Sequence, residues 1–334
     1  MEPTNSNLYQ PLTGEEKQKI QENAQEIAGL LSIWASCCPV IRAKRVPPVA
    51  VLIATVLPGL PLHTQLLVGK LILFIFAVDD LADERLLSYV EFKRAGKAWQ
   101  EIALDGQAAH PVEQDGGLSA VLSEIRGELA QFSIFPELCP LWANRLGQLC
   151  DAMAGEYDFG LRYKASGETE LPALEVYVDG GIHSVGFPFW GTSVLILLDE
   201  PPVLEHMDVI GEIILQTGAA IRLYNDVRTY EKEVQEGNVN AVTLFLRALS
   251  TGNSALPEAE RLAKAQERVL RLADMYAQRC QAHAAAQMTT TGQFELMIRR
   301  IVAFHASFYG SRQHNFDYHT ISSSDSYSMI QGVL

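Results

Sequence analysis

Basic residues are scarce in this chain. Its 334 residues include 26 lysines and arginines against 40 aspartates and glutamates, which gives a net charge of −14. Such an acidic protein repels nucleic acid and anionic membranes, so neither is expected as a partner. The charge also implies that an anionic ligand binds only together with metal ions that reverse the local field.

Cysteine and histidine show no metal-ligand spacing. The cysteines are odd in number and form no metal motif, so we expect reduced, mostly buried thiols in a cytoplasmic protein. They are Cys37, Cys38, Cys139, Cys150 and Cys280. The eight histidines contain no H-x-x-E-H or similar set. The sequence therefore does not predict a zinc site.

Long uninterrupted apolar runs and a targeting segment are also missing. The apolar stretch from Val46 to Val78 is broken by four prolines and by Lys70, so no run reaches the ~18 residues that span a bilayer. The N-terminus has no basic region followed by an apolar one, as a signal peptide would. With 48% hydrophobic and 20% charged residues, the composition indicates a soluble protein with a large core and no stable membrane insertion.

Strand patterns and a glycine-rich phosphate loop are absent, and helical periodicity dominates. The expected helices cover 14–35, 63–83, 117–133, 138–165, 203–234, 258–286 and 291–310. The breaks between them lack the length or bias of an interdomain linker, and no internal repeat is found. We therefore predict one all-α domain over residues 1–334, with loose tails at about 1–13 and 319–334.

An acidic cluster ends the apolar run that precedes it. Asp79, Asp80 and Asp83 directly follow eight apolar residues, 71–78. Carboxylates beside so much apolar surface are costly unless a cation meets them. On a helix, Asp79 and Asp83 share a face and are the expected metal ligands, whereas Asp80 points about 100° away and is expected to orient basic side chains.

A second polar cluster occupies residues 225–233. Asn225, Thr229 and Glu233 are spaced i, i+4 and i+8 and fall on one helical stripe, with Asp226 to one side of it. Both clusters offer only oxygen donors, which suit Mg²⁺ rather than zinc or copper. The two clusters together suggest several Mg²⁺ ions that hold a phosphate group.

Two cationic side chains lie close to the helical stripe of the second cluster. Lys232 is about 20° and Arg222 about 60° from it, so either side chain could donate to a phosphate oxygen. An i, i+4 surface ion pair explains either residue equally well.

The two clusters read D-D-x-x-D and N-D-x-x-[ST]-x-x-x-E, and in this order they resemble the two metal-binding motifs of class I terpene synthases. The resemblance extends over roughly residues 15–320. It implies the isoprenoid synthase fold, an antiparallel helical bundle around a deep apolar pocket, and often a homodimer. It also implies about three Mg²⁺ ions and the ionisation and cyclisation of a linear prenyl diphosphate to a cyclic hydrocarbon or alcohol. Such a reaction needs no enzymic nucleophile, and the sequence shows no recognisable triad.

One departure from the family lies in residues 177–186, which resemble its kinked helix, Y-x-x-x-R-x-x-[ST]-x-G. Tyr177, Ser184 and Gly186 match, but Gly181 replaces the arginine that senses the diphosphate in the family. Gly180 and Gly181 also weaken a helix, so a break is expected at this pair.

A second departure is the C-terminal Arg-Tyr pair of the family. Tyr318 follows Asp317 here, and the nearest arginine is Arg312. The missing diphosphate donors are therefore expected from Arg222, Lys232 or Arg312.

The family resemblance also suggests which residues line the pocket, and the size of these residues bears on the length of the substrate. The expected pocket and kink residues are Ile75, Tyr177, Gly181, Ser184, Val185, Phe187 and Trp190. Ile75 in place of an aromatic, together with the small Gly180 and Gly181, predicts room for twenty-carbon geranylgeranyl diphosphate ahead of fifteen-carbon farnesyl diphosphate. Phe187, Phe189 and Trp190 could instead fill that space; as aromatic walls they would also stabilise carbocations.

Two other interpretations remain. A chain-elongating prenyltransferase shares the fold and the first motif, but normally carries a second aspartate-rich motif where this chain has Asn225, Thr229 and Glu233. A non-catalytic protein that binds prenyl diphosphates is favoured only by Gly181 and the altered Arg-Tyr pair.

Overall fold

Helices make up the regular secondary structure of the protein. The structure is a computed structural model that describes residues 12–110, 115–166, 171–251 and 257–310, and no strand occurs in these ranges. The predicted all-α class is therefore confirmed. The helices are α1 (Gly14–Ser36), α2 (Val46–Val56), α3 (Leu62–Asp83), α4 (Tyr89–Asp105), α5 (Leu118–Leu129), α6 (Phe135–Ser166), α7 (Leu174–Ser184), α8 (Phe187–Leu198), α9 (Met207–Glu236), α10 (Ala241–Thr251), α11 (Glu258–His283) and α12 (Gln293–Gly310).

The seven helices that periodicity predicts are all present as α1, α3, α5, α6, α9, α11 and α12, with ends that differ by a few residues. The helices α7 and α8 form the kinked region that the family resemblance implies. The periodicity misses α2, α4 and α10. The helix α2 is short and almost wholly buried, so it has no polar face to set a period.

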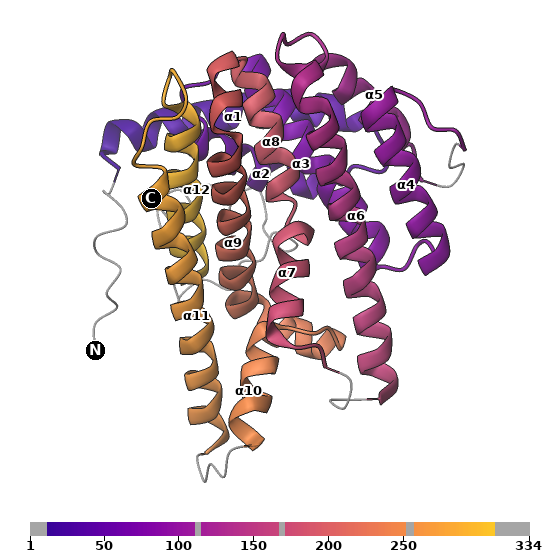
Figure 1. Ribbon diagram of the computed structural model, residues 1–334, viewed down its shortest axis with the longest axis vertical. Helices are drawn as coiled ribbons and strands as arrows, with labels where there is room; N and C mark the ends of the chain where they lie inside the picture. The colour runs from indigo at the N-terminus through magenta and orange to yellow at the C-terminus, as the bar shows by residue number, and fades with distance from the viewer. Residues whose placement is uncertain (1–11, 111–114, 167–170, 252–256, 311–334) are drawn as a thin grey trace.

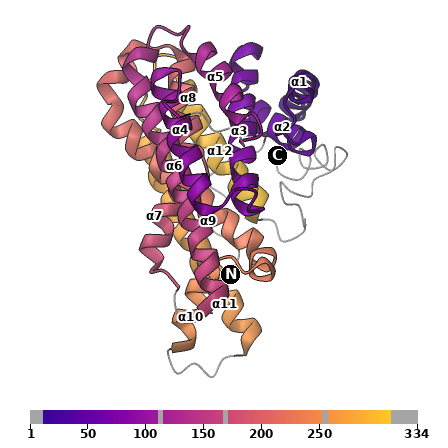
Figure 2. The ribbon, with the colours of Figure 1, turned by 90° about the vertical axis from the view of Figure 1, so that its right-hand side faces the viewer.

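The long helices run side by side along the longest axis of the molecule. Figure 1 shows α6, α9 and α11 in this direction, with α10 at the lower end. The helix α9 packs against α11, α12, α7 and α8, whereas α6 packs against α4, α7 and α8. Figure 2 shows α1 and α2 on the side away from α7 and α10. The buried apolar side chains form one contiguous core, which includes most of α3.

The kink between α7 and α8 lies later than the sequence predicts. Gly180 and Gly181 lie inside α7, and the predicted break at this pair is wrong, because glycine costs a helix only about 1 kcal/mol per residue. The helix ends instead at Ser184, and the chain turns at Gly186, whose φ of +75° is a left-handed conformation that glycine adopts without strain. This turn starts α8 in a new direction.

The structure can be compared with two further predictions, which concern the two ends of the chain and its apolar segments. Most of the expected loose tails lie outside the described residues, but Thr13 caps α1 in a capping box with Glu16. Over the described residues, one helical run, Leu174–Leu198, is long and apolar enough to cross a membrane by composition. Of its most apolar window, 78% is buried inside the protein, as is usual for a core helix.

Candidate active site

A cavity of about 520 Å³ brings the two polar clusters together. Asp79, Asp80 and Asp83 reach it from α3, and the stripe residues of the second cluster reach it from α9. Its remaining walls come largely from α6, α7, α8 and α12. The lining residues Asp83, Glu84, Arg85 and Glu236 are exposed, whereas Ile72, Trp190 and Ile301 are buried. The cavity therefore has a charged mouth and an apolar interior.

Asp79 and Asp83 stand at this mouth with excess negative charge between them. Burial and the Asp83 carboxylate raise the pKa of Asp79 well above its usual range. Although Asp83 keeps contact with solvent at the mouth, desolvation of its carboxylate by the surrounding walls and the charge of the Glu156 carboxylate raise the pKa of Asp83 to about 6. Both shifts mean that the ionised carboxylates lack sufficient cationic partners, a situation that a bound metal ion relieves.

Asp80 points away from Asp79 and forms two ion pairs. Its carboxylate lies 2.6 Å from Arg45 Nη2 and 3.1 Å from Arg42 Nε. Arg45 is only 1% exposed, and its guanidinium lies 4.6 Å from the centre of the Phe76 ring. These contacts fix the last turn of α3 against the 3₁₀ turn Ala43–Arg45 and so orient the neighbouring Asp79 and Asp83.

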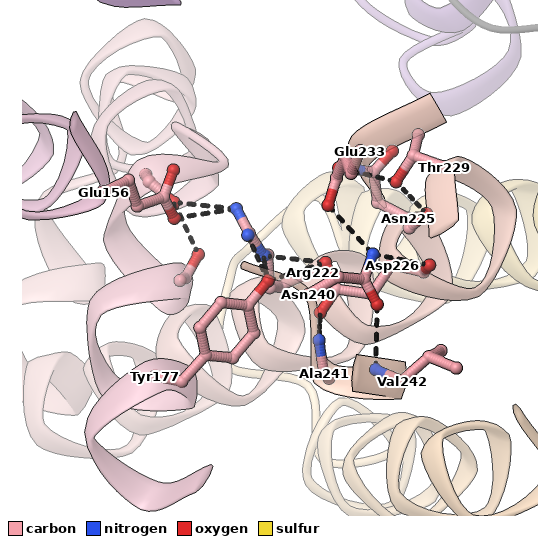
Figure 3. A network of polar contacts seen from close by, with 12 residues as sticks. Glu156, Tyr177, Arg222, Asn225, Asp226, Thr229, Glu233, Asn240, Ala241 and Val242 are labelled. Carbon is pink, nitrogen blue, oxygen red and sulfur yellow. Dashed lines mark hydrogen bonds and ion pairs between the residues drawn. The ribbon is translucent and has the colours of Figure 1, made fainter. Parts of the chain in front are cut away.

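The second cluster forms a continuous row of oxygen atoms on α9. The Thr229 hydroxyl donates to Glu233 Oε1 at 2.7 Å and lies 2.8 Å from the Asn225 carbonyl oxygen. Asn240 donates through Nδ2 to Glu233 Oε2 at 2.9 Å and to the Asp226 carbonyl oxygen at 2.9 Å (Figure 3). Glu233 is thus held from both sides, and all three stripe residues line the cavity.

Beneath this row, Asp226 is fully buried and does not line the cavity. It lies 2.9 Å from Arg222 Nε and accepts hydrogen bonds from Tyr177 Oη at 3.1 Å and from the Ala241 backbone N–H at 3.1 Å. The carboxylate therefore ties α9 to α7 and to the start of α10.

Arg222 lies between these helices and the cavity. Its Nη1 donates to Glu156 Oε1 at 2.8 Å and to Ser184 Oγ at 3.3 Å, and its guanidinium lies 4.9 Å from the centre of the Tyr177 ring. Figure 3 shows this network, with Glu156 on the opposite side of Arg222 from Asp226. The sequence interpretation misses Glu156, whose only signal is a charge on a long predicted helix.

The other predicted residues divide into two groups. Ile75, Tyr177, Ser184, Val185 and Trp190 line the cavity, as do Arg222 and Lys232, whereas Gly181 and Phe187 do not. Phe187 is fully buried and packs edge-on against Trp190, with ring centres 4.8 Å apart. Lys232 lies at the mouth, with Nζ 3.9 Å from Glu236 Oε1. Arg312 lies outside the described residues.

The prediction that Gly180 and Gly181 enlarge the pocket is wrong. Neither residue lines the cavity. A Cβ at Gly181 would lie 2.7 Å from Arg222 Cγ, so the Arg222 side chain already takes this room.

The donor set fits a hard divalent cation shared with a ligand. In the described ranges, no three His, Cys, Asp or Glu side chains converge closely enough to hold a metal ion by themselves. Mg²⁺ commonly takes one or two carboxylates and completes its shell with phosphate oxygens and water. The Asp79–Asp83 pair and the row of Asn225, Thr229 and Glu233 have this character.

Comparison with known proteins gives a consistent picture. A family model described as terpene synthase family 2, C-terminal metal binding, matches residues 70–269, which include both clusters. An ent-pimara-9(11),15-diene synthase from Streptomyces sp. (strain KO-3988) is 29% identical over 140 residues. That alignment covers 40% of this chain and 45% of the Streptomyces protein, so the chain matches less than half of this relative's length.

Two solved structures share the arrangement of helices. The linalool/nerolidol synthase of Streptomyces clavuligerus, in complex with 2-fluorogeranyl diphosphate, has a TM-score of 0.63 at 11% identity and covers 87% of this chain and 96% of that one. The isoprene synthase of grey poplar (Populus x canescens), in complex with three Mg²⁺ ions and dimethylallyl-S-thiolodiphosphate, has a TM-score of 0.65 at 17% identity and covers 96% of this chain and 59% of that one. At such low identity the likeness establishes the isoprenoid synthase fold.

Proposed function

This chain belongs to the terpene synthase family, whose model matches more than half of it, and we propose that it is a class I terpene cyclase. The proposed substrate is a linear prenyl diphosphate, which is ionised and cyclised to a terpene hydrocarbon or alcohol with release of diphosphate. One observation carries the proposal: two sets of oxygen donors meet at the charged mouth of a cavity whose interior is apolar.

Asp79 and Asp83 on one side, and Asn225, Thr229 and Glu233 on the other, are the proposed ligands of about three Mg²⁺ ions. Mg²⁺ would neutralise the charge that develops on the leaving diphosphate. The structure of the poplar isoprene synthase, which is in complex with three Mg²⁺ ions, supports the choice of metal and the number of ions. Asp80 and Asp226 do not ligate in this proposal; their ion pairs with Arg45 and Arg222 hold the ligand-bearing turns in place.

The interior walls are suited to a carbocation. Ile75, Phe76, Trp190 and Ile301 line the cavity, and these side chains offer no nucleophile. Aromatic faces attract cations by about 2 kcal/mol when water is excluded. Such walls fold the chain of the substrate and keep water away until proton loss or water capture ends the reaction.

We propose geranylgeranyl diphosphate as the first candidate substrate and farnesyl diphosphate as the second. Ile75 on the wall supports the longer chain, and Phe187 packs behind Trp190 rather than into the cavity. The glycine argument no longer contributes, because Arg222 fills the space beside Gly181. The cavity volume of about 520 Å³ lies within the ~300–1,000 Å³ range of small-molecule sites and leaves room for either chain.

Gas chromatography–mass spectrometry of extracts tests this proposal. Purified protein is incubated with ten-, fifteen- and twenty-carbon prenyl diphosphates and Mg²⁺, with and without isopentenyl diphosphate. Cyclic hydrocarbons or alcohols are the expected products. Longer linear diphosphates would show a chain-elongating prenyltransferase instead, and tight binding without release of diphosphate over hours would show a non-catalytic binding protein.

The remaining proposals concern organisation. We propose that the chain acts as one domain, in line with its single contiguous core, and that it forms a homodimer, as the family resemblance implies. A cytoplasmic location is supported by the five cysteines, none of which forms a disulfide.

A further inference from the structure

The side chain of Arg222 takes the space that any side chain at residue 181 would need. A Cβ built on Gly181 would lie 2.7 Å from Cγ, 3.1 Å from Cδ and 3.3 Å from Nε of Arg222. Next to it in α7, a Cβ on Gly180 would meet nothing within 4 Å. Glycine at 181 is therefore the condition under which the Arg222 stem can pass from α9 to the face of α7.

Arg222 is held at this place by three helices. From α7, Tyr177 Oη lies 3.1 Å from Nε and also contacts Nη2. From α9 itself, Asp226 lies 2.9 Å from Nε, and from α6, Glu156 accepts from Nη1 at 2.8 Å (Figure 3). With contacts on every nitrogen, the guanidinium has one defined orientation at the cavity wall.

Arg222 differs from the other cations of the cavity wall in its burial. The described lining residues also include Arg85 and Lys164, which are exposed, and Lys232, whose side chain is 38% exposed. Arg222 as a whole is only 8% exposed. Solvent and salt weaken the ion pairs and hydrogen bonds of exposed cations, whereas those of a buried guanidinium are screened less, and its planar fork matches phosphate oxygens.

The two sides of the guanidinium have different partners. The Nε side is fixed by Asp226, which is fully buried, whereas the Nη1 side faces Glu156, whose side chain is 32% exposed. A phosphate oxygen can replace Glu156 as the acceptor on Nη1 without disturbing the contact with Asp226. Glu156 would then hold the fork in position until the ligand arrives.

We propose that Arg222, reaching from α9 into the space beside Gly181, is the buried guanidinium that binds the diphosphate group in this protein, with Tyr177, Asp226 and Glu156 as its positioning residues. The diphosphate contact is thus supplied by α9, the helix that also carries Asn225, Thr229 and Glu233. This inference rests on the proposed function, because both place a diphosphate at the cavity mouth.

Calorimetric titration of the full chain with inorganic diphosphate in the presence of Mg²⁺ tests the inference without any turnover. Arg222→Gln keeps an amide donor for Asp226 but removes the charge, so diphosphate affinity should fall about 10- to 100-fold, as for the loss of a charge-assisted hydrogen bond. The control variant is Arg271→Gln. The Arg271 side chain is 73% exposed and forms a surface ion pair with Glu267, so this variant should bind diphosphate as the wild type does.

A matched pair of glycine variants provides a second test. Gly181→Ala places a methyl group against Arg222 and should weaken diphosphate binding, whereas Gly180→Ala meets open space and should not. Both changes add helix propensity to α7, so a general effect on that helix would be common to both. The exchange variant Gly181→Arg with Arg222→Ala, which lacks the Cγ and Cδ atoms that a side chain at residue 181 would meet, should recover affinity relative to Arg222→Ala alone.

The outcomes separate this inference from the proposed function. Wild-type protein that binds diphosphate and turns over a prenyl diphosphate, with unchanged affinity in Arg222→Gln and Gly181→Ala, would overturn the role of Arg222 alone. Wild-type protein that neither binds diphosphate with Mg²⁺ nor turns over a prenyl diphosphate would overturn both. If Arg222→Gln does not fold by circular dichroism, the difference between Gly181→Ala and Gly180→Ala decides the question.

Discussion

Asn240→Ala should have two effects. It should lower the free energy of unfolding, and it should leave the Glu233 side chain of the second cluster less firmly held. Asn240 is fully buried and donates to Glu233 Oε2 and to the Asp226 carbonyl oxygen, each at 2.9 Å, while its Oδ1 accepts from the Val242 N–H at 2.8 Å. Two hydrogen bonds between neutral groups contribute about 1 kcal/mol each and the one to a carboxylate about 2 kcal/mol, so the loss is about 4 kcal/mol at most. Water that enters the site would reduce this cost.

The same change should weaken metal binding, because Glu233 loses one of the two groups that orient it. Removing such a support typically lowers metal affinity about 10- to 100-fold. Urea unfolding measures the first effect and Mg²⁺ titration in the presence of diphosphate measures the second. Thr243→Val is the matched control, since the buried Thr243 hydroxyl has no hydrogen-bond partner among the described residues. An Asn240→Ala variant as stable as Thr243→Val, with unchanged Mg²⁺ affinity, would refute this reasoning.

Three further changes test the kink, the core and a buried histidine. Gly186→Ala forces a residue with a side chain into a φ of +75° and puts its Cβ 2.8 Å from Ile75 Cγ2. It should therefore lower the melting temperature and alter the product mixture seen by mass spectrometry, and unchanged products would contradict this. Trp142→Phe removes the 2.7 Å hydrogen bond to Ser193 Oγ and part of a buried ring, so it should lower the free energy of unfolding in urea by about 2–4 kcal/mol; an unchanged value would contradict this. Burial lowers the pKa of His305 from 6.5 to about 4, so the unfolded chain takes up a proton first as the pH falls. The resulting loss of stability sets in below pH 6.5 and reaches at most about 3 kcal/mol near pH 4. His305→Phe should remove this part of the pH dependence in unfolding titrations, and identical pH profiles for the variant and the wild type would disprove it.

How well the sequence predicts each helix depends on whether the helix has two distinct faces. The helix α11 has an apolar stripe and a polar face, and the sequence locates it to within three residues. The buried α2 and α8 lack such a contrast, so periodicity alone cannot separate them from a buried strand. The helix α4 is amphipathic and begins with a capping box at Ser88 and Glu91, a signal that could have located it.

The site divides in the same way between local and distant relations. Helical spacing places Asp79 and Asp83 on one face and Asn225 and Glu233 on another, and this spacing can be read from the sequence. Glu156 reaches the site from α6 and Asn240 from the position just before α10, and only the packing of those helices shows that the two residues belong to it.

The relation of Gly181 to Arg222 is the clearest case of what the sequence hides. The sequence shows that an expected arginine is missing, but not that an arginine 41 positions later fills the vacated space, which depends on the contact between α7 and α9. The same contact explains why the predicted gain in pocket volume does not occur.

The rate of diphosphate release from geranylgeranyl and farnesyl diphosphate, measured with and without Mg²⁺, tests the central claim most directly. The wild-type protein should release diphosphate only with Mg²⁺, and Asp79→Ala and Asn225→Ala should each reduce the rate at least about 100-fold, as expected when a transition-state charge loses its electrostatic support. Folded variants that keep the full rate, or release by the wild type in the absence of any divalent cation, would contradict the account.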